Sequence, residues 1–291
     1  MIKELLDLKP RNPYLSIALD EALVRFYEKK DDFRGAIRLW SNPFSIVMGR
    51  TCIPDENLKP SFIAEFNPSM MKTKWRLSPA LCRRASGGGT VIHGPGNINY
   101  SLCISLKAFP ELFDLKKSYQ VLLGMVSRAI EAQGVECGIR GLSDIVCFKD
   151  GVEKKISGNS QFRKSGILVH HGTLITRNNL IHSVSEYLIH PPKEPDYRQG
   201  RSHESFLGSL PDGFDLTTFY SVLSEELMRY LNQDYSEKMS SEEKREIFRY
   251  ARKLVRDVYV CNDWVLKGKV SYGPEKNNSG EININISETG T

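Results

Sequence analysis

A run of alternating apolar and polar residues over 98–106 is the strongest constraint on the fold of this 291-residue chain. Successive side chains of a β-strand point to opposite faces of a sheet, so an alternation with period two predicts a strand. One face of this strand is apolar and the other is polar. The apolar positions are Ile98, Tyr100, Leu102, Ile104 and Leu106, and the intervening ones are Asn99, Ser101, Cys103 and Ser105.

Further strand-like segments are separated by short turn signals. Two short strands are predicted upstream of the alternation, with a turn at Asn42-Pro43 between them. Downstream, turns at Asp150-Gly151 and Lys164-Ser165-Gly166 separate three segments, which predicts an antiparallel meander because short turns join antiparallel neighbours. The predicted strands cover residues 36–40, 45–50, 144–148, 152–162 and 167–175.

Amphipathic helices are predicted where apolar residues recur at steps of three and four. Residues 55–79 show no period and are predicted to be a loop or insertion, and the Gly- and Asn-rich end to be a short edge strand with a frayed tail. Hairpins and separated helices favour an α+β fold with a mixed, largely antiparallel sheet flanked by helices. The predicted helices cover residues 14–29, 115–130 (stopping at Gly134), 215–230, and a segment from a Ser240–Glu243 capping box to about Val255.

Composition excludes several classes of protein. Hydrophobic residues make up 40% and charged residues 26% of the chain, which is typical of a folded globular protein. No apolar stretch approaches the roughly 18 residues of a membrane span, and the charged N-terminus lacks the apolar block of a signal peptide, so we expect a cytoplasmic protein. The net charge of +5 is compatible with an anionic partner such as a nucleotide, an acidic protein or RNA, and equally with a solvated surface of mixed charge. Six cysteines without a C-x-x-C pair indicate reduced thiols.

The stretch RRASGGGTVIH combines two arginines with three consecutive glycines. Glycines let the backbone approach a ligand and point N–H groups at an anion, while Arg83 and Arg84 supply donors for phosphate or carboxylate oxygens. The spacing is neither a Walker A nor a Rossmann pattern, and a strand rather than a helix is predicted to follow. A plain glycine-rich hairpin is the alternative, but the neighbouring His93, Asn97 and Asn99 favour an anion site.

A second polar stretch, EKKISGNSQ, places Lys155 two residues before a Ser-Gly pair in the predicted meander. A lysine is a flexible point charge that can offset a carboxylate and a phosphate at once, whereas its neighbour Lys154 is interpreted as an ordinary exposed lysine. His170 and His171 lie on the next strand, where only one of them can face the site. Without acidic or Cys neighbours they make a poor metal site.

These motifs together resemble the lipoate–protein ligase A family, within the biotin/lipoate protein ligase fold. They occur in order from about residue 10 to about residue 207. The resemblance implies a catalytic domain over residues 1–210 and a helical C-terminal extension with a short tail over 211–291. The motifs are NPYLSIALDEAL, IRLWSNPFSIVMGR, RRASGGGTVIHGPGNINYSL, GLSDIV, KKISGNSQ, HHGTL and HPPKEPDYRQGRSHESF.

The resemblance implies a two-step reaction. Lipoate and Mg-ATP would form enzyme-bound lipoyl-AMP and pyrophosphate, and the lipoyl group would then pass to a lysine of a carrier domain. The implied carriers are apo lipoyl domains of 2-oxoacid dehydrogenase complexes and the glycine cleavage H protein, with no nucleic acid and no membrane as partner. Many relatives that carry out both steps have a C-terminal accessory domain, so an accessory subunit or preformed lipoyl-AMP are both open alternatives for activation.

The motif match also implies roles for individual residues. Lys155 would contact the lipoyl carbonyl oxygen and the α-phosphate, and it is the expected catalytic residue. Asp144 matches a family aspartate near the adenylate, with a role in positioning or in holding Mg²⁺. The residues expected to bind the ligands are Arg84, Gly87, Gly88, Gly89, Thr90, Val91, Ile92, His93, Asn97, Asp144, Lys155, Ser157, Gly158 and His171.

Three rival functions stay open at this point. An ATP-independent octanoyl or lipoyl transferase of the same fold would use a cysteine thioester, with Cys147 as the candidate nucleophile. A biotin ligase is disfavoured because the Gly- and Arg-rich adenylate loop expected there is absent. A non-catalytic protein that binds lipoyl-adenylate is disfavoured by the presence of Arg84, the three glycines and Lys155.

Overall fold

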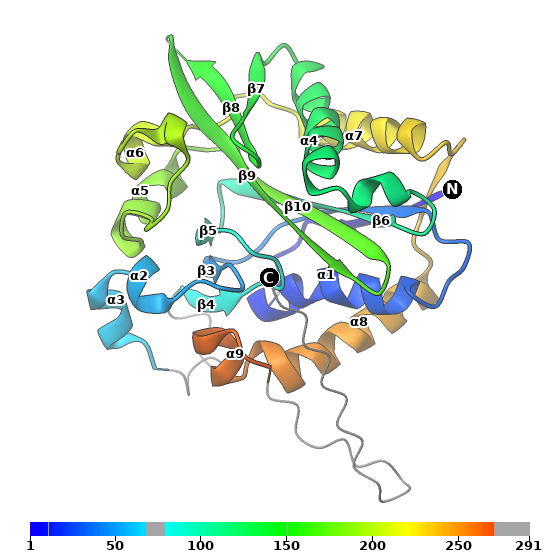
Figure 1. Cartoon of the computed structure of the whole chain (residues 1–291), viewed down its shortest axis with the longest axis horizontal. Coiled ribbons are helices and arrows are strands. Elements are labelled where there is room, and N and C mark those ends of the chain that lie inside the picture. Colours follow the sequence, from blue (N-terminus) through cyan, green and yellow to red (C-terminus); the bar gives the residue numbers. More distant parts are fainter. Residues whose placement is uncertain (11, 68–78, 150, 271–291) are drawn as a thin grey trace, which may run out of the picture.

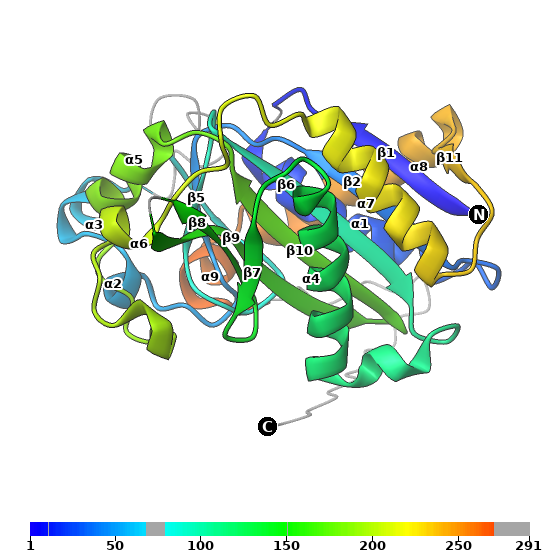
Figure 2. The same ribbon diagram turned by 90° about the horizontal axis from the view of Figure 1, so that it is seen from above.

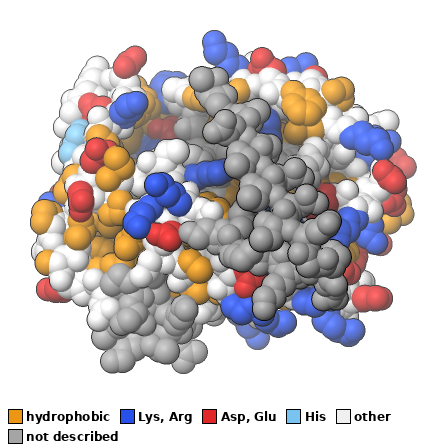
Figure 3. Space-filling view, turned by 60° about the horizontal axis from the view of Figure 1, so that its bottom comes forward, with side chains coloured by type: hydrophobic (Ala, Val, Ile, Leu, Met, Phe, Trp, Pro, Cys, Tyr) orange, Lys and Arg blue, Asp and Glu red, His pale blue; other side chains and the backbone are white. Residues whose placement is uncertain are grey.

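An eight-stranded mixed sheet forms the centre of the protein (Figure 1). The computed structural model describes residues 1–10, 12–67, 79–149 and 151–270, and the other residues are grey in Figures 1 and 3. In chain order, the strands of this sheet are β1 (Ile2–Asp7), β2 (Gly35–Trp40), β6 (Asn97–Ser105), β7 (Cys137–Arg140), β8 (Asp144–Lys149), β9 (Val152–Lys164), β10 (Ile167–Ile175) and β11 (Ser236–Lys238).

The strand order across this sheet is β11-β1-β2-β6-β10-β9-β8-β7. Strand β1 pairs in parallel with both of its neighbours, and all the other pairs are antiparallel. The predicted meander is therefore confirmed as β8-β9-β10, although Asp150 of its first turn lies outside the described residues. A second, three-stranded sheet has the order β4-β3-β5 and consists of β3 (Ser45–Met48), β4 (Ala80–Arg83) and β5 (Val91–His93).

Helices cover both faces of the large sheet. The pair α4 (Leu115–Glu131) and α7 (Leu216–Tyr230) covers one face, and the pair α1 (Pro13–Tyr27) and α8 (Ser241–Leu254) covers the other (Figures 1 and 2). Each helix pair closes one hydrophobic core, and the three-stranded sheet packs into the core beside α1. The expected α+β fold is thus confirmed. The shorter elements are α2 (Pro54–Asn57), α3 (Pro60–Glu65), α5 (Asn179–Tyr187), α6 (His203–Phe206), α9 (Asn262–Lys267), 3₁₀ turns at Pro110–Phe113 and Asp196–Arg198, and a π turn at Val255–Tyr259.

Local capping signals explain where the predicted helices begin and end. The side chain of Asp215 caps α7, and Ser240 and Glu243 form the predicted capping box of α8. Helix α4 is followed by Gly134, whose φ of +75° lets the chain reverse there. The C-terminal region packs against the rest of the protein. Strand β11 pairs with β1, α7 packs on α4, and α8 packs on α1.

The prediction of a loop over residues 55–79 was partly wrong. Its described part contains α2 and α3, which begin at Pro54 and Pro60; a proline at the first helical position is favourable because its fixed φ suits the helix and its missing N–H needs no partner. Residues 68–78 and the predicted C-terminal edge strand and tail lie outside the described residues. None of the helices in the described ranges has the length and apolar character needed to cross a membrane.

The polar face of β6 is buried rather than exposed to water. Ser101 donates to Asp20 Oδ1 over 2.8 Å, and the fully buried Arg38 pairs with the same oxygen at 2.9 Å and with Asp7 Oδ2 at 3.3 Å. Buried charges persist in proteins when they are paired and hydrogen-bonded. The alternation correctly predicted two faces, but a charged network between β6, β2 and α1 takes the place of water on one of them.

Charged side chains on one face of the molecule are mixed in sign. Among the residues coloured in Figure 3, Lys and Arg side chains are interspersed with acidic ones. This pattern agrees with the spread of charge along the sequence.

Candidate active site

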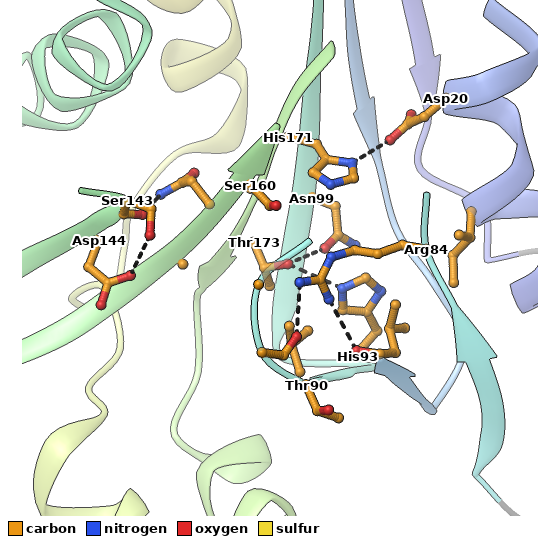
Figure 4. Close-up of a pocket in the computed structure, with 18 of the residues that line it drawn as sticks. Asp20, Arg84, Thr90, His93, Asn99, Ser143, Asp144, Ser160, His171 and Thr173 are labelled. Carbon is orange, nitrogen blue, oxygen red and sulfur yellow. Dashed lines mark hydrogen bonds and ion pairs between the residues drawn. The ribbon is translucent and has the colours of Figure 1, made fainter. Parts of the chain in front are cut away.

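Two adjoining cavities of about 160 Å³ and about 310 Å³ lie between the glycine-rich loop that follows β4 and strands β9 and β10. In Figure 4, Ser143 and Asp144 lie on one side of the smaller cavity, and Arg84, Thr90 and His93 lie on the other. The cavities meet along eight residues that line both. These are Gly89, Thr90, Val91, Ser143, Asp144, Lys155, Gly158 and Thr173.

The two cavities differ in lining. The smaller one ends at Ile17, Trp40 and Val47, next to the buried polar groups of β6 and β10. The larger one is lined by apolar side chains of α5, including Leu180, Ile181 and Val184, and by Phe206 and Leu207 at the end of α6. Arg140, Lys193 and Arg198 also line the larger cavity, so its lining combines an apolar wall with cations.

Lys155 and Asp144 form an ion pair where the cavities meet. Lys155 Nζ lies 2.8 Å from Asp144 Oδ1, and the second carboxylate oxygen accepts a hydrogen bond of 2.8 Å from Tyr197. A Cβ at Gly158 would lie 3.0 Å from the end of the Lys155 side chain, so this glycine leaves room for the lysine to lie along its own strand. The ammonium is thereby held at the boundary of the two cavities.

Arg84 holds the glycine-rich loop in place through hydrogen bonds. Its guanidinium donates to the carbonyl oxygens of Gly87 at 2.5 Å and Gly89 at 2.9 Å, to Ser86 Oγ at 3.0 Å, and to the carbonyl oxygen of Val47 at 3.2 Å. Burial lowers the pKa of Arg84 to about 10. Arg84 lines the smaller cavity as expected, but these donors fix the loop instead of reaching freely toward an anion.

A buried chain of hydrogen bonds anchors the same loop to α1. Ser86 Oγ lies 2.6 Å from His171 Nε2, and His171 Nδ1 lies 2.8 Å from Asp20 Oδ2 (Figure 4). Burial raises the pKa of Asp20, but the hydrogen bond from His171 and the charge of Arg38 outweigh it and hold that pKa below its ordinary value. Because the Asp20 carboxylate can only accept, His171 Nδ1–H donates to it, and Nε2 of the neutral ring then accepts from the Ser86 hydroxyl. Ser86 lines neither cavity, so the chain positions the loop and does not present a nucleophile.

Comparison with known proteins assigns the chain to a family. The family model described as lipoyl protein ligase A/B catalytic domain matches residues 12–248. The chain belongs to this family. Lipoate-protein ligase LplJ of Bacillus subtilis is 28% identical over 182 residues, which are 62% of this chain and 48% of that protein. A putative lipoate-protein ligase A of Schizosaccharomyces pombe is 29% identical over 183 residues, 63% of this chain and 43% of that protein. The matched part thus spans less than half the length of either relative.

Solved structures show the same fold. A bi-partite lipoate protein ligase of Thermoplasma acidophilum, described with its E2 lipoyl domain, superposes with a TM-score of 0.70 at 20% identity, covering 94% of this chain and 99% of that chain. A lipoate-protein ligase A bound with ATP superposes with a TM-score of 0.67 at 20% identity, covering 91% and 98%. The expected lipoyl protein ligase fold is therefore confirmed.

Most of the residues that were predicted to bind the ligands line the cavities, while Gly87 and Ser157 line neither. Gly87 instead accepts hydrogen bonds through its carbonyl oxygen from Arg84 and Ser160, and the side chain of Ser157 is fully buried. Ten predicted residues line the smaller cavity and two others only the larger one. The ten are Arg84, Gly88, Gly89, Thr90, Val91, His93, Asp144, Lys155, Gly158 and His171, and the two are Ile92 and Asn97.

Sequence reasoning missed several lining residues and misjudged one arginine. Asp20 lies beside the apolar stripe of α1, and this acidic residue inside the NPYLSIALDEAL motif was the available signal. Arg83 was expected to face an anion, but it lines neither cavity and binds backbone carbonyls. The other missed lining residues of the smaller cavity are Ile17, Trp40, Val47, Ser143, Asn159, Ser160, Gly172 and Thr173.

The two adjacent histidines of β10 face opposite cores, as the alternation of a strand predicts. His171 faces the smaller cavity, whereas His170 is buried between Tyr100 and Tyr119 on the other side of the sheet. The His93 ring is held by two other side chains. Its Nδ1 faces the amide nitrogen of Asn42, and its Nε2 faces the Thr173 hydroxyl. The amide nitrogen of Asn42 can only donate, so the proton of neutral His93 resides on Nε2.

Acid is expected to destabilise the protein through two of these histidines. Burial lowers the pKa of His93 and of His170 to about 3. An unfolded histidine has a pKa of about 6.5, so below that pH the unfolded chain binds more protons and stability falls as the pH decreases toward 3. Each histidine should remove about 2 kcal/mol of unfolding free energy between neutral pH and pH 5. Urea denaturation at both pH values would measure the loss.

A matched pair of variants separates these histidines from other acid effects. His170→Asn should reduce the acid-induced loss by about 2 kcal/mol, whereas His182→Asn should leave it unchanged because the His182 side chain is 85% exposed. An unaltered pH dependence in His170→Asn would contradict the assignment.

Proposed function

We propose that this chain is an ATP-dependent lipoate–protein ligase. The observation that carries the proposal is the position of Lys155, which lines both cavities at the place where they meet. Joining an unactivated carboxylate to ATP brings two anions together, and a lysine between two binding cavities offsets that repulsion. The names of the relatives support lipoate as the acyl substrate, since they are lipoate-protein ligases.

The smaller cavity suits the acyl chain and the larger one suits the nucleotide. The smaller cavity ends at Ile17, Trp40 and Val47, which offer apolar contacts to a hydrocarbon chain. The larger cavity has almost twice the volume and is lined by apolar α5 side chains and by cations such as Lys193, which suit a base and its phosphates. In this arrangement the carboxylate and the α-phosphate meet at Lys155.

The proposed reaction has two balanced steps. A carboxylate oxygen of lipoate attacks the α-phosphorus of ATP, and pyrophosphate leaves with the electron pair of the broken P–O bond. The ε-amine of a carrier lysine then attacks the lipoyl carbonyl carbon, loses a proton, and AMP leaves. Lys155 must release Asp144 to contact the reacting oxygens, and the charge developing on them favours that exchange.

We propose that Asp144 would help to hold a magnesium ion. No group of three or more His, Cys, Asp or Glu side chains in the described ranges is arranged to hold a metal. Magnesium is often held by one carboxylate together with phosphate oxygens and water, so Asp144 fits as a single protein ligand once Lys155 has moved away. The ion would neutralise phosphate charge during activation.

The thioester alternative finds no support in the cavities. All six cysteines lie in the described ranges, and none of them lines either cavity. Cys147 is buried in the core beneath α4, and it pairs across the strands with Lys154 rather than with Lys155. A thiol nucleophile must reach the acyl group, so this position disfavours a cysteine-dependent transferase.

We propose apo lipoyl domains of 2-oxoacid dehydrogenase complexes and the glycine cleavage H protein as acceptors; one structural neighbour is described together with its E2 lipoyl domain. Residues 1–210 would form the catalytic domain and 211–291 its helical extension, acting in the cytoplasm. An accessory subunit would be needed only if activation fails with the chain alone.

A mass measurement tests the proposal directly. The purified chain is incubated with lipoate, Mg-ATP and an unmodified lipoyl domain, with a parallel reaction on synthetic lipoyl-AMP. A lipoyl mass increase and pyrophosphate release with ATP support a complete ligase. An increase only with lipoyl-AMP would limit the chain to transfer and point to the accessory subunit. No increase in either reaction refutes the proposed function.

Gly49→Ala should impair activation through the glycine-rich loop. A Cβ at Gly49 would lie 1.9 Å from the carbonyl oxygen of Gly88, so the loop must move away from its position over β9. A displacement near 1 Å can cost about 100-fold in rate, which is the expected loss of pyrophosphate release. Gly124→Ala in α4 is the control, because its Cβ would approach only the flexible end of Arg128 at 3.3 Å and should leave the rate unchanged.

A further inference from the structure

The first arginine of the glycine-rich motif binds the loop that follows β3. Arg83 is 1% exposed, and its Nη1 group donates to the carbonyl oxygens of Gly49 at 2.8 Å, Arg50 at 2.9 Å and Cys52 at 2.8 Å. One guanidinium thus gathers three carbonyls of a single short loop. The buried guanidinium needs acceptors for its N–H groups, and the three bonds that it forms here fix the conformation of this loop.

The opposite edge of the same guanidinium binds helix α9. Arg83 Nε donates to the carbonyl oxygen of Val265 at 3.0 Å, and Nη2 donates to that of Leu266 at 3.2 Å. In return the indole N–H of Trp264 donates to the carbonyl oxygen of Arg83 at 3.0 Å. Trp264 is 3% exposed and Val265 fully buried, so α9 is a packed part of the core and not a loose appendage.

The loop held by Arg83 lies directly against the glycine-rich loop. The Arg50 N–H donates to the carbonyl oxygen of Ser86 at 2.8 Å, and Cys52 Sγ contacts the carbonyl oxygen of Gly88 at 3.3 Å. Gly49 lacks the Cβ that would collide with Gly88. A continuous set of contacts therefore runs from α9 through Arg83 and residues 49–52 to the glycine-rich loop, where Gly88 lines the smaller cavity.

We propose that α9 is a positioning element of the active site, and that Arg83 is the positioning residue that connects it to the glycine-rich loop. Helix α9 lies beyond residues 12–248, the range that matches the family. The proposal rests on the proposed ligase function for its kinetic consequence, whereas the structural coupling between α9 and the loop can be measured without activity.

The test substitutes one residue at each end of the connection. Arg83→Lys keeps the charge, but a single ammonium cannot donate to both α9 and the loop of residues 49–52. Trp264→Phe keeps an aromatic ring in the core and removes only the N–H that binds the Arg83 carbonyl. Lys267→Ala is the control on α9. The Lys267 side chain is 62% exposed, and its ion pair is with Asp263 of the same helix.

Amide hydrogen exchange is the first readout. Both variants should raise exchange at residues 86–89 about tenfold, equivalent to about 1.4 kcal/mol of local stability, with β6 and β10 unchanged. Lys267→Ala should exchange like the wild type. Unchanged exchange at 86–89 in either variant, or an equal rise in β6 and β10 from global destabilisation, would overturn the coupling.

Kinetics of pyrophosphate release supply the second readout. The KM values for ATP and lipoate should rise about tenfold in both variants while kcat changes less, because a loosened loop weakens substrate binding before it alters the chemistry. Faster loop exchange with unchanged KM values would overturn the positioning role. If the wild-type chain itself releases no pyrophosphate, the ligase proposal fails, and the exchange data still decide the coupling.

Discussion

Lys155→Ala is expected to lower kcat/KM for ATP-dependent lipoylation by about 10²–10³-fold, the usual cost of losing one group that stabilises charge in a transition state. The lysine lines both cavities, and its ammonium is the partner of Asp144 at their boundary. Both steps should slow, since the same ammonium would contact the carbonyl oxygen during transfer. Pyrophosphate release measures the first step, and lipoylation from synthetic lipoyl-AMP measures the second.

The neighbouring Lys154 provides a matched control for this variant. Its ammonium donates to the carbonyl oxygens of Ser205 at 2.5 Å and Glu204 at 3.4 Å, and it lines neither cavity. Lys154→Ala removes the same charge one position away, so its activity should stay near the wild-type value. Equal losses in the two variants would mean that overall charge matters and that Lys155 has no special role.

Asp20→Ala is expected to destabilise the protein by about 3–5 kcal/mol, because removing a buried carboxylate weakens the compensation of its buried cationic partner and leaves its hydrogen-bond donors without an acceptor. Arg38 is fully buried and would retain Asp7 at 3.3 Å as its remaining carboxylate partner in the ion pairs of this network. His171 and Ser101 would also lose the oxygens that they contact. Urea denaturation at pH 7 measures the free energy of unfolding.

The choice of pH 7 for the unfolding measurement follows from the direction in which the pKa of Asp20 is shifted. Interactions in the folded state hold the Asp20 pKa below its ordinary value, so its contribution is complete above about pH 4 and is lost as the pH falls through the folded pKa. Asp31→Ala is the control, because the side chains of Asp31 and its partner Lys107 are 99% and 79% exposed and such pairs contribute little. A similar small loss in both variants would rule out a structural role for the buried network.

The pattern of residues along the chain predicted the long helices α1, α4, α7 and α8 and six of the strands, but it missed the short helices and the strands β1, β4, β5, β7 and β11. The alternation over 98–106 became β6, the turn signals separated β8, β9 and β10, and Ser240 with Glu243 began α8. These features depend on residues a few positions apart, which a sequence displays directly. The motifs around Gly87–Gly89 and Lys155 also indicated the family, which the family match over residues 12–248 confirmed.

Only the tertiary structure decided what each polar side chain contacts. Arg83 and Arg84 are adjacent in sequence and both suit an anion, yet Arg83 binds carbonyls of α9 and of the loop after β3, and Arg84 binds carbonyls of the glycine-rich loop. Asp20 became part of the site through contacts with His171 and Arg38. A buried donor needs an acceptor. Which acceptor it meets depends on contacts between segments that are far apart in the chain, and no local sequence pattern contains that information.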